Sequence, residues 1–281
     1  TNLKNGRMNM KKRLLAFLLV LMMVVSVAGT SAFAAPASTV AVDTATVTTY
    51  KDVDSLGLNG TIVVYPRALE TSDEQFPVIA WANGTGCITQ LYYKLFELWA
   101  EMGYVVVSDT NVMTGDGNSV VASIDYITAK NADPDSVFYG KIDLDAIGAS
   151  GHSQGGKAVV NAAAKDSRIK CIFSIAGSSM SSESKKVTCP AFYAAGTGDL
   201  IVLASLWVKP SYNGSSGPAV YAALKMAPHT TCIIVPDKIA YYGGLWFDLY
   251  LKGQSDLTSV FTAGGQLSND SNWSGFACKG F

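Results

Sequence analysis

The sequence predicts an α/β fold, with one mostly parallel central sheet and helices on both of its faces. Continuous apolar runs such as 104–108 suit strands that are buried on both faces, as parallel sheets require. These runs alternate along the chain with segments of helical spacing, which is the pattern of successive strand–helix units. The 281 residues are 49% apolar and 15% charged, so the chain can bury one large core.

The first expected strands precede any helix. An alternating stretch at 46–48 predicts an edge strand, and 61–65 predicts a second strand that stops at Pro66. A third, buried strand is expected at 77–81, ahead of a glycine-rich turn. Apolar residues in the segment 91–102 then recur at helical spacing, which predicts the first helix.

The rest of the chain continues this alternation. Strands are expected at 104–108, 145–151, 170–175 and 191–195, and helices at 118–130, 157–165 and 239–251. The residues of the 145–151 segment are small, so its assignment rests on context more than on β-propensity. The apolar run 219–226 fits a strand or a helix, because its periodicity favours neither.

The N-terminal segment, residues 1–34, has the layout of a secretory signal peptide with a few upstream residues. A basic triplet at 11–13 is followed by an apolar run at 14–28 and by a small-residue cleavage site that ends at Ala34. The run is shorter than the roughly 20 residues that span a bilayer, which argues against a stable membrane anchor. We therefore expect a secreted protein, or a periplasmic one if the source has an outer membrane, with residues 35–281 as a single domain.

Cleavage would leave an acidic protein. The first 34 residues contain five basic side chains and no acidic ones, so their removal takes the net charge from −1 to −6. A protein of this charge has no electrostatic attraction to nucleic acid or to anionic membranes. We expect a monomer that binds neither.

Five cysteines follow the predicted cleavage site: Cys87, Cys171, Cys189, Cys232 and Cys278. Export permits disulfides, and the odd number leaves at least one thiol free or paired between chains. Cys171 with Cys189, and Cys232 with Cys278, are candidate pairs that the sequence leaves open. No Cys-x-x-Cys spacing occurs, so neither a zinc site nor a redox motif is expected.

The stretch Gly151-His152-Ser153-Gln154-Gly155 matches the G-x-S-x-G pattern of a nucleophile elbow. Such an elbow is a sharp strand-to-helix turn that holds the serine in a strained backbone conformation, and the flanking glycines provide the space that it needs. Ser153 is therefore the candidate nucleophile. The backbone N–H of Gln154, at the start of a helix, is a candidate oxyanion donor. The competing interpretation is an ordinary turn with a surface serine.

The chain contains two histidines, and His152 lies within the elbow. Its position there directs its side chain away from the hydroxyl of Ser153. His229, in a loop-like stretch after the 219–226 run, is therefore the candidate general base. A lone loop histidine is by default a surface residue, but no other imidazole is free to serve Ser153.

In this type of fold the acid of the triad lies between the serine and the histidine in chain order. Asp166, Glu183 and Asp199 meet this condition. Asp166 ends the predicted elbow helix and Glu183 lies in a polar loop. Asp199 follows a strand and a glycine turn, which is where sites of α/β proteins are assembled, so it is the candidate acid. The alternative is an aspartate that caps a turn.

The loop after the strand at 77–81 is the expected source of a second oxyanion donor. Its sequence, Asn83-Gly84-Thr85-Gly86, lets backbone N–H groups approach a substrate closely. The donor is Gly84 or Thr85, and the sequence does not separate the two. A plain tight turn is the alternative.

With these motifs in place, the chain from about residue 61 to residue 251 resembles the α/β-hydrolase superfamily, in its branch of cutinases and polyester (PET) hydrolases. The resemblance implies Ser153 as nucleophile, Asp199 as acid and His229 as base, with oxyanion donors at Gln154 and near Gly84. It also implies hydrolysis of carboxylic esters without a cofactor. The stretches that carry it are 78–86, 103–107, 151–156, 189–199 and the loop around His229.

Three departures from that branch bear on the substrate. The family usually has an aromatic residue where Gly84 stands and a methionine where Gln154 stands. It often carries a tryptophan after the sixth strand, where residues 176–178 have none. Because aromatic faces would hold an aromatic diester, the departures leave ester hydrolysis in place and put efficient PET cleavage in question. Aromatic residues that could substitute are Trp207, Tyr212, Tyr241, Tyr242 and Trp246.

The sequence thus predicts a secreted serine esterase that forms an acyl-enzyme and prefers apolar acyl groups, as cutinases and lipases do. A carbohydrate esterase that releases acetyl or feruloyl groups is the alternative enzyme. A non-catalytic binding protein on a hydrolase scaffold is the alternative of a different class. Acyl transfer to an alcohol instead of water would use the same residues.

Overall fold

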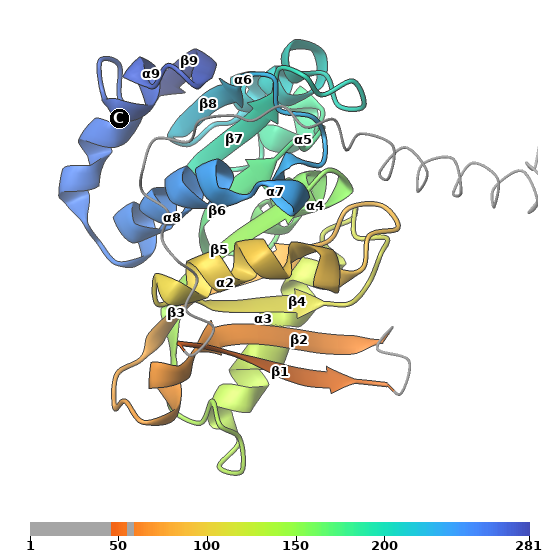
Figure 1. The fold of residues 1–281 in the computed structure, drawn as a ribbon, viewed down its shortest axis with the longest axis vertical. Coiled ribbons are helices and arrows are strands. Elements are labelled where there is room, and N and C mark those ends of the chain that lie inside the picture. The colour runs from red at the N-terminus through yellow and green to blue at the C-terminus, as the bar shows by residue number, and fades with distance from the viewer. Residues whose placement is uncertain (1–45, 55–58) are drawn as a thin grey trace, which may run out of the picture. The chain divides into compact units, whose positions relative to one another are not determined.

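The computed structural model describes residues 46–54 and 59–281 of the chain. The predicted signal peptide lies outside the described residues. The described residues belong to one compact unit, which is built around a nine-stranded sheet with the order β1-β2-β4-β3-β5-β6-β7-β8-β9 (Figure 1). The strands from β4 across to β8 are mutually parallel, and antiparallel pairs close the two edges, β1 and β2 on one side and β9 on the other.

The strands are β1 (Val47–Val53), β2 (Gly60–Pro66), β3 (Phe76–Ala82), β4 (Val105–Asp109), β5 (Ile142–His152), β6 (Ile169–Ile175), β7 (Ala191–Gly196), β8 (Ala219–Leu224) and β9 (Trp273–Lys279). The helices are α2 (Tyr93–Glu101), α3 (Asn118–Ala132), α4 (Gln154–Ala163), α5 (Ser181–Ser184), α6 (Lys209–Gly214), α7 (Thr231–Ile234), α8 (Asp237–Leu251) and α9 (Gln266–Asn269). Short 3₁₀ turns are η1 (Arg67–Glu70), η2 (Thr89–Tyr92) and η4 (Ser255–Phe261), and η3 (Ala204–Val208) is a π-helical turn.

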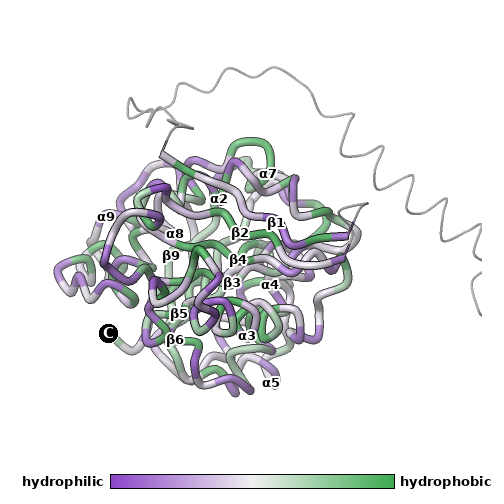
Figure 2. Tube along the Cα trace, turned by 90° about the horizontal axis from the view of Figure 1, so that it is seen from below, coloured by the Kyte–Doolittle hydropathy of each residue, from purple (hydrophilic) through white to green (hydrophobic). Residues whose placement is uncertain are grey.

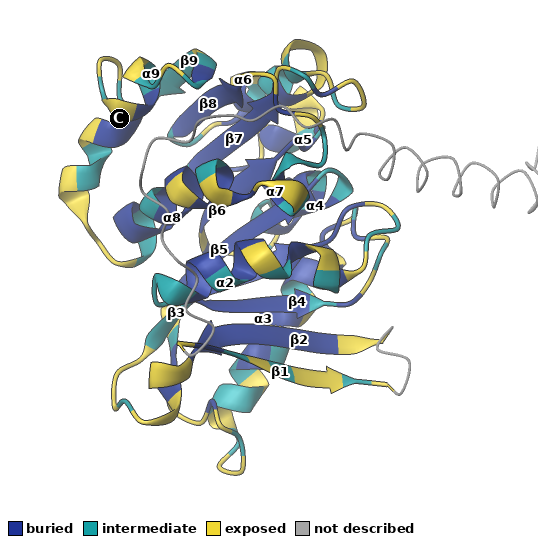
Figure 3. Ribbon diagram, in the orientation of Figure 1, coloured by how far each residue is buried: buried dark blue, intermediate teal, exposed yellow. Residues whose placement is uncertain are grey.

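Helices cover both faces of the sheet, and each face has its own hydrophobic core. Helices α2 and α8 lie over one face, where Trp81, Trp99 and Phe247 are fully buried (Figure 1). Helices α3 and α4 pack on the other face, together with strand residues such as Val78 and Val107. The hydrophobic stretches follow the central strands (Figure 2), and these strands are the most completely buried part of the fold (Figure 3). This layering confirms the predicted α/β class.

The strand register brings the ends of several strands to one edge of the sheet. Ala82 of β3 pairs with Gly151 of β5, and His152 pairs with Ile175 of β6. Because these strands are parallel, the loops that follow β3, β5, β6, β7 and β8 all leave from this edge. Residues far apart in the chain therefore meet there.

Most predicted elements occur where the sequence indicated, with three differences. The ambiguous run at 219–226 forms a strand, β8, buried between β7 and β9. The elbow helix begins at Gln154, earlier than the predicted 157–165. The predicted helix at 91–102 opens with the 3₁₀ turn η2 before α2 begins.

The cysteines are free thiols in this structure, so neither candidate disulfide is formed. Cys278 lies in β9, where it pairs in register with Val220, whereas Cys232 is buried in α7. Within the described part of the chain, no helix combines the length and the apolar composition needed to cross a bilayer.

Candidate active site

Ser153 stands at the turn between β5 and α4 in a strained backbone conformation. Its φ of 58° and ψ of −117° lie in a region that non-glycine residues rarely adopt. The turn is held in place because the N–H of Ser153 donates to the carbonyl of Ile175 at 2.9 Å. The residue is half-buried and is not enclosed in either core. This is the geometry that the G-x-S-x-G motif predicted.

The glycines of the motif are required by close backbone packing. A methyl group on Gly155 would overlap the carbonyl oxygen of Ala82 in β3, and one on Gly151 would overlap the carbonyl of Gly155. A methyl group on Gly156 would come within 2.7 Å of Gly177. The nucleophile turn therefore fits between β3 and the loop after β6 only without side chains at these positions.

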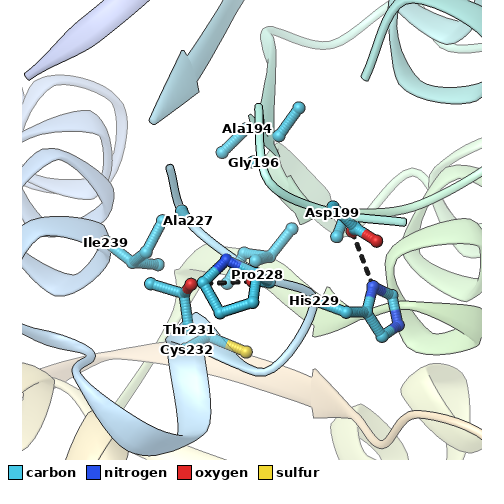
Figure 4. Close-up of a pocket in the computed structure, with 12 residues that line it drawn as sticks. Ala194, Gly196, Asp199, Ala227, Pro228, His229, Thr231, Cys232 and Ile239 are labelled. Carbon is cyan, nitrogen blue, oxygen red and sulfur yellow. Dashed lines mark hydrogen bonds and ion pairs between the residues drawn. The ribbon is translucent and has the colours of Figure 1, made fainter. Parts of the chain in front are cut away.

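Asp199 and His229 form a hydrogen-bonded pair at the same edge of the sheet (Figure 4). Asp199 follows β7 and His229 follows β8, and the distance from Asp199 Oδ2 to His229 Nδ1 is 2.7 Å. The Asp199 side chain is fully buried, and that of His229 is 12% exposed. The other two acid candidates have different partners, since Asp166 pairs with Arg168 at 2.6 Å and Glu183 with Lys157 at 3.2 Å.

The Asp199 carboxylate is stabilised in its charged form despite its burial. Burial alone would raise its pKa, but three hydrogen bonds outweigh that effect and the pKa lies below its ordinary value. The donors are the imidazole of His229 and the backbone N–H groups of Ile201 and Val202, the latter two at 2.8 Å. A carboxylate anchored in this way can orient the imidazole and stabilise its cation.

His229 lies directly beside the nucleophile turn. Its ring centroid is 4.6 Å from that of His152, the residue that precedes Ser153. Among the described residues, no hydrogen bond joins the Ser153 hydroxyl to His229. In enzymes without bound substrate such bonds are often long and tighten when the substrate arrives.

Two neighbouring residues of the loop after β3, Gly84 and Thr85, differ in their surroundings. The N–H of Gly84 donates to the hydroxyl of Tyr92 at 3.1 Å, and Gly84 is buried. Thr85 is exposed, and its N–H has no acceptor among the described residues. Of the two residues that the sequence could not separate, the geometry therefore favours Thr85 as an oxyanion donor.

Buried polar residues that the sequence analysis did not single out hold this loop. The side-chain amide of Asn83 donates to Thr89 at 2.9 Å and to the carbonyls of Asp109 and Asn111, and its oxygen accepts from the indole of Trp81. No motif in the sequence indicated these contacts, and two of the four join Asn83 to residues 26 and 28 positions away.

The side chain of Gln154 ties a second loop to the nucleophile turn. Its Oε1 accepts the N–H of Thr114 at 2.9 Å, and the Thr114 hydroxyl donates to the carbonyl of Asn83 at 2.7 Å. The backbone N–H of Gln154 lies in the first turn of α4, where helical N–H groups have no intrahelical acceptor. That N–H remains available as an oxyanion donor.

Two hollows of different size lie near the site. The pocket drawn in Figure 4, which Asp199 and His229 help to line, encloses about 10 Å³, roughly the space of one water molecule. A larger cavity of about 360 Å³ is lined by Lys157, Ser178, Ser179, Met180, Leu206, Trp207 and Pro210. Its volume falls within the range of small-molecule sites, which is roughly 300–1,000 Å³.

One residue that lines the larger cavity, Lys157, lies on the helix that follows Ser153. Lys157 is one helical turn beyond the serine, and its N–H donates to the Ser153 carbonyl. Trp207 is 51% exposed and lines the cavity. Of the aromatic residues considered as substitutes for the family's tryptophan, Tyr212, Tyr242 and Trp246 are buried in the core, and Tyr241 is exposed on α8 outside the cavity.

Among the described residues, no group of three or more His, Cys, Asp or Glu side chains is arranged to hold a metal ion.

A mostly parallel sheet of this order, with a strained serine after β5 and an Asp–His pair on the loops after β7 and β8, defines an α/β-hydrolase with the layout of an ester hydrolase. The chain belongs to the PETase family, described as PET hydrolase-like, which it matches over residues 27–276. It is also 26% identical over 202 residues to the bis(hydroxyethyl) terephthalate hydrolase of Streptomyces coelicolor. That match covers 69% of this chain and 63% of the relative.

Proposed function

We propose that the chain is an exported, monomeric serine esterase that hydrolyses carboxylic esters through an acyl-enzyme, with esters of aromatic acids as its substrate class. The observation that carries the proposal is the 2.7 Å hydrogen bond from His229 to Asp199, formed beside a serine with a strained backbone. Ser153 is the nucleophile, His229 the general base and Asp199 the residue that orients the base.

The hydrogen bond to Asp199 selects the tautomer of His229 that a base requires. A carboxylate only accepts hydrogen bonds, so Nδ1 carries the proton of the neutral ring and Nε2 keeps its lone pair. Nε2 lies on the side of the ring that points away from Asp199 (Figure 4). It is the atom that takes the proton of Ser153.

The reaction has two steps. The Ser153 oxygen bonds to the ester carbonyl carbon while its proton passes to His229, and the negative charge on the carbonyl oxygen is met by the N–H groups of Gln154 and Thr85. The C–O bond to the alcohol then breaks, and the alcohol leaves with the proton from His229. Water attacks the acyl-enzyme in the same way, which releases the acid and returns the proton to Ser153.

The cavity lined by Trp207 supports an aromatic or other large apolar acyl group. Trp207, Leu206 and Met180 offer it an apolar wall, and a ring on Trp207 would contribute about 0.5–1.5 kcal/mol beyond its area of contact. The Streptomyces relative is named for bis(hydroxyethyl) terephthalate, a small diester of an aromatic diacid. A soluble diester of this kind is the first substrate to test, ahead of the polymer.

Substitution of Ser153 by Ala tests the proposal. The variant should lose at least about 10⁴-fold in the rate of hydrolysis of p-nitrophenyl esters and of bis(hydroxyethyl) terephthalate, because it lacks the hydroxyl that forms the acyl-enzyme. A fluorophosphonate probe should label the wild type and leave the variant unlabelled. Near-full activity of the variant would remove Ser153 from the mechanism.

Two controls make that test specific. The Ser178→Ala variant removes another hydroxyl that lines the neighbouring cavity, and it should keep its reactivity with the probe. A panel of acetyl, butyryl, benzoyl and feruloyl esters separates an aromatic-ester hydrolase from a carbohydrate esterase. A wild type that neither turns over any ester nor reacts with the probe would indicate a non-catalytic protein.

A further inference from the structure

His152, the histidine that the triad does not use, is buried and hydrogen-bonded through both ring nitrogens. Its Nδ1 lies 3.0 Å from the hydroxyl of Tyr92, and its Nε2 lies 2.9 Å from the backbone carbonyl oxygen of His229. The hydroxyl of Tyr92 also accepts the N–H of Gly84 at 3.1 Å. One continuous network thus joins the loop after β3, the nucleophile turn and the loop that carries the base.

The donor and the acceptor of each hydrogen bond in the network can be assigned, because the carbonyl of His229 at one end only accepts and the N–H of Gly84 at the other only donates. A carbonyl oxygen only accepts, so His152 Nε2 must carry the proton that it donates to His229. The neutral ring then has a lone pair on Nδ1, which accepts the hydroxyl proton of Tyr92. The oxygen of Tyr92 is left to accept from the N–H of Gly84. Every donor therefore has an acceptor, with one tautomer and one hydroxyl orientation.

We propose that Tyr92 and His152 are positioning residues, which act through hydrogen bonds to Gly84 and to the carbonyl of His229 to hold the oxyanion loop and the base loop in register with Ser153. This inference rests on the proposed esterase function. It gives a role to His152, which is not part of the proposed triad, and to Tyr92, which lies outside the sequence motifs.

The network matters because two hydrogen bonds, one to the side chain and one to the carbonyl, hold the proposed base His229. His229 follows β8 in a loop, its side chain is held by Asp199 and its carbonyl by His152. The loop after β3 is likewise turned so that the N–H of Gly84 faces inward to Tyr92. The next residue, Thr85, is exposed.

The aromatic packing around Tyr92 makes the network rigid. Its ring contacts Trp81 at 4.8 Å and Phe96 at 6.3 Å between centroids, and the residue is fully buried. His152 is 2% exposed. Burial lowers the pKa of His152 to about 3, so the ring stays neutral and keeps the single-donor form that the network requires.

Tyr92→Phe and Tyr93→Phe form a matched pair of variants. Both remove one buried hydroxyl, but the hydroxyl of Tyr93 has no hydrogen-bond partner among the described residues, whereas that of Tyr92 has two. We expect Tyr92→Phe to lower kcat about tenfold with little change in KM, because the reacting groups shift while the acyl cavity is unchanged. Tyr93→Phe should match the wild type, and the unfolding midpoints show that both variants are folded.

His152→Asn and His152→Gln separate the two halves of the network. Gln places an N–H donor near the position of Nε2 and can keep the bond to His229, whereas the shorter Asn cannot reach that carbonyl. We expect Asn to lower kcat about tenfold and Gln to restore most of it. In the Tyr92→Phe/His152→Asn double variant the combined loss should be smaller than the product of the single losses, because both remove parts of one network.

The tautomer itself gives a readout that does not depend on catalysis. In ¹⁵N NMR spectra His152 should be neutral and protonated on Nε2 from pH 8 to pH 5. Protonation on Nδ1, or a charged ring near pH 6, would overturn the network whatever the activity. An active wild type with equal kcat in all four single variants would overturn the positioning role alone, whereas an inactive and unlabelled wild type would refute the esterase function.

Discussion

At the scale of single residues, the buried imidazole of His152 should make the stability of the protein sensitive to acid. Burial, and secondarily the nearby His229, lower the pKa of His152 from 6.5 to about 3, although the hydrogen bond to His229 and the charge of Asp199 act in the opposite direction. The hydroxyl of Tyr92 also faces the ring. The unfolded chain therefore binds one more proton at this residue than the folded protein between these two pH values.

The sign of this difference predicts a loss of stability on acidification. The free energy of unfolding should fall by roughly 1.4 kcal/mol for each pH unit below 6.5, until the folded-state pKa is reached. Between pH 6.5 and pH 4.5 the unfolding midpoint should drop by roughly 5–10 °C, as measured by circular dichroism. Carboxylates with lowered pKa values, such as Asp199 and Asp166, add to the loss only at lower pH.

His152→Gln is the control for this prediction. The variant has no titrating group at position 152, so its midpoint should change less over the same two pH units. Equal pH dependence in the variant and in the wild type would show that His152 does not cause the effect.

Much of the site could be predicted at this scale. Ser153 follows from a local motif, His229 from the count of two histidines, and Asp199 from its place after a strand and a glycine turn. The structure brings Asp199 and His229 together as the sequence indicated. The sequence could not show whether Gly84 or Thr85 is the better candidate oxyanion donor. That choice depends on the hydrogen bond from Gly84 to the hydroxyl of Tyr92, a residue outside the motifs.

At the scale of elements, the turn between β5 and α4 has no room for a side chain at Gly155. Substitution by Ala would place a methyl group against the carbonyl of Ala82 in β3, so strand and helix would have to separate. We expect Gly155→Ala to lower the free energy of unfolding by about 3 kcal/mol or more, as measured by denaturant titration.

Gly253→Ala provides the comparison for that prediction. Gly253 has a φ of +68° but open space where the methyl group would lie, so only the backbone cost of about 1–2 kcal/mol applies. A smaller loss at Gly155 than at Gly253 would contradict close packing of the nucleophile turn.

The segment between Asp199 and α6 is an exposed apolar element beside the site. Its side chains include Leu200 at 88% exposed, Leu206 at 65% and Trp207 at 51%. Trp207 belongs to the π-helical turn η3, a form that often marks functional positions. An exposed apolar segment of this kind suits contact with an apolar substrate.

Trp207→Ala should therefore affect substrates selectively. We expect KM for benzoyl or terephthaloyl esters to rise about three- to tenfold, with little change for acetyl esters, because a small acyl group does not reach the indole. Tyr241→Ala removes an exposed aromatic side chain of α8 and should leave both KM values unchanged. Equal changes for acetyl and benzoyl esters would exclude Trp207 from the acyl site.

The elements themselves were predictable where their pattern was strong. Buried parallel strands such as β4 have continuous apolar runs that indicate them directly. The run that forms β8 has no such periodicity, and its neighbours β7 and β9 decide its structure. Strand β9 escaped prediction because it lies at the edge, is only partly buried and contains Gly275 with a φ of +63°.

At the scale of the whole molecule, the sheet order explains why the site forms where it does. Parallel pairing aligns the ends of β3, β5, β7 and β8 at one edge, so the segments that carry Gly84, Ser153, Asp199 and His229 all leave from it. Tyr92 and His152 are 60 residues apart, and His152 and His229 are 77 apart, yet each pair is hydrogen-bonded there.

The proposed export of the protein, and the cleavage that accompanies it, can be measured directly. When the full chain is expressed in a secreting bacterial host, the exported protein should begin at Ala35, as shown by its intact mass. Leu19→Arg places a charge in the apolar run and should keep the protein inside the cell, whereas Leu19→Val should not. Exported protein that retains residues 1–34 would contradict cleavage at this site.

The sequence by itself determined the fold class and singled out Ser153, Asp199 and His229 as the candidate nucleophile, acid and base. Each of these rests on local periodicity, on a short motif or on a count of residue types, none of which requires knowledge of distant contacts. The tertiary structure alone decided that Gly84 bonds to Tyr92, that both ring nitrogens of His152 are hydrogen-bonded and that Trp207 lines the larger cavity. Those outcomes depend on hydrogen bonds and packing between residues far apart in the chain, and only the folded sheet brings such residues together.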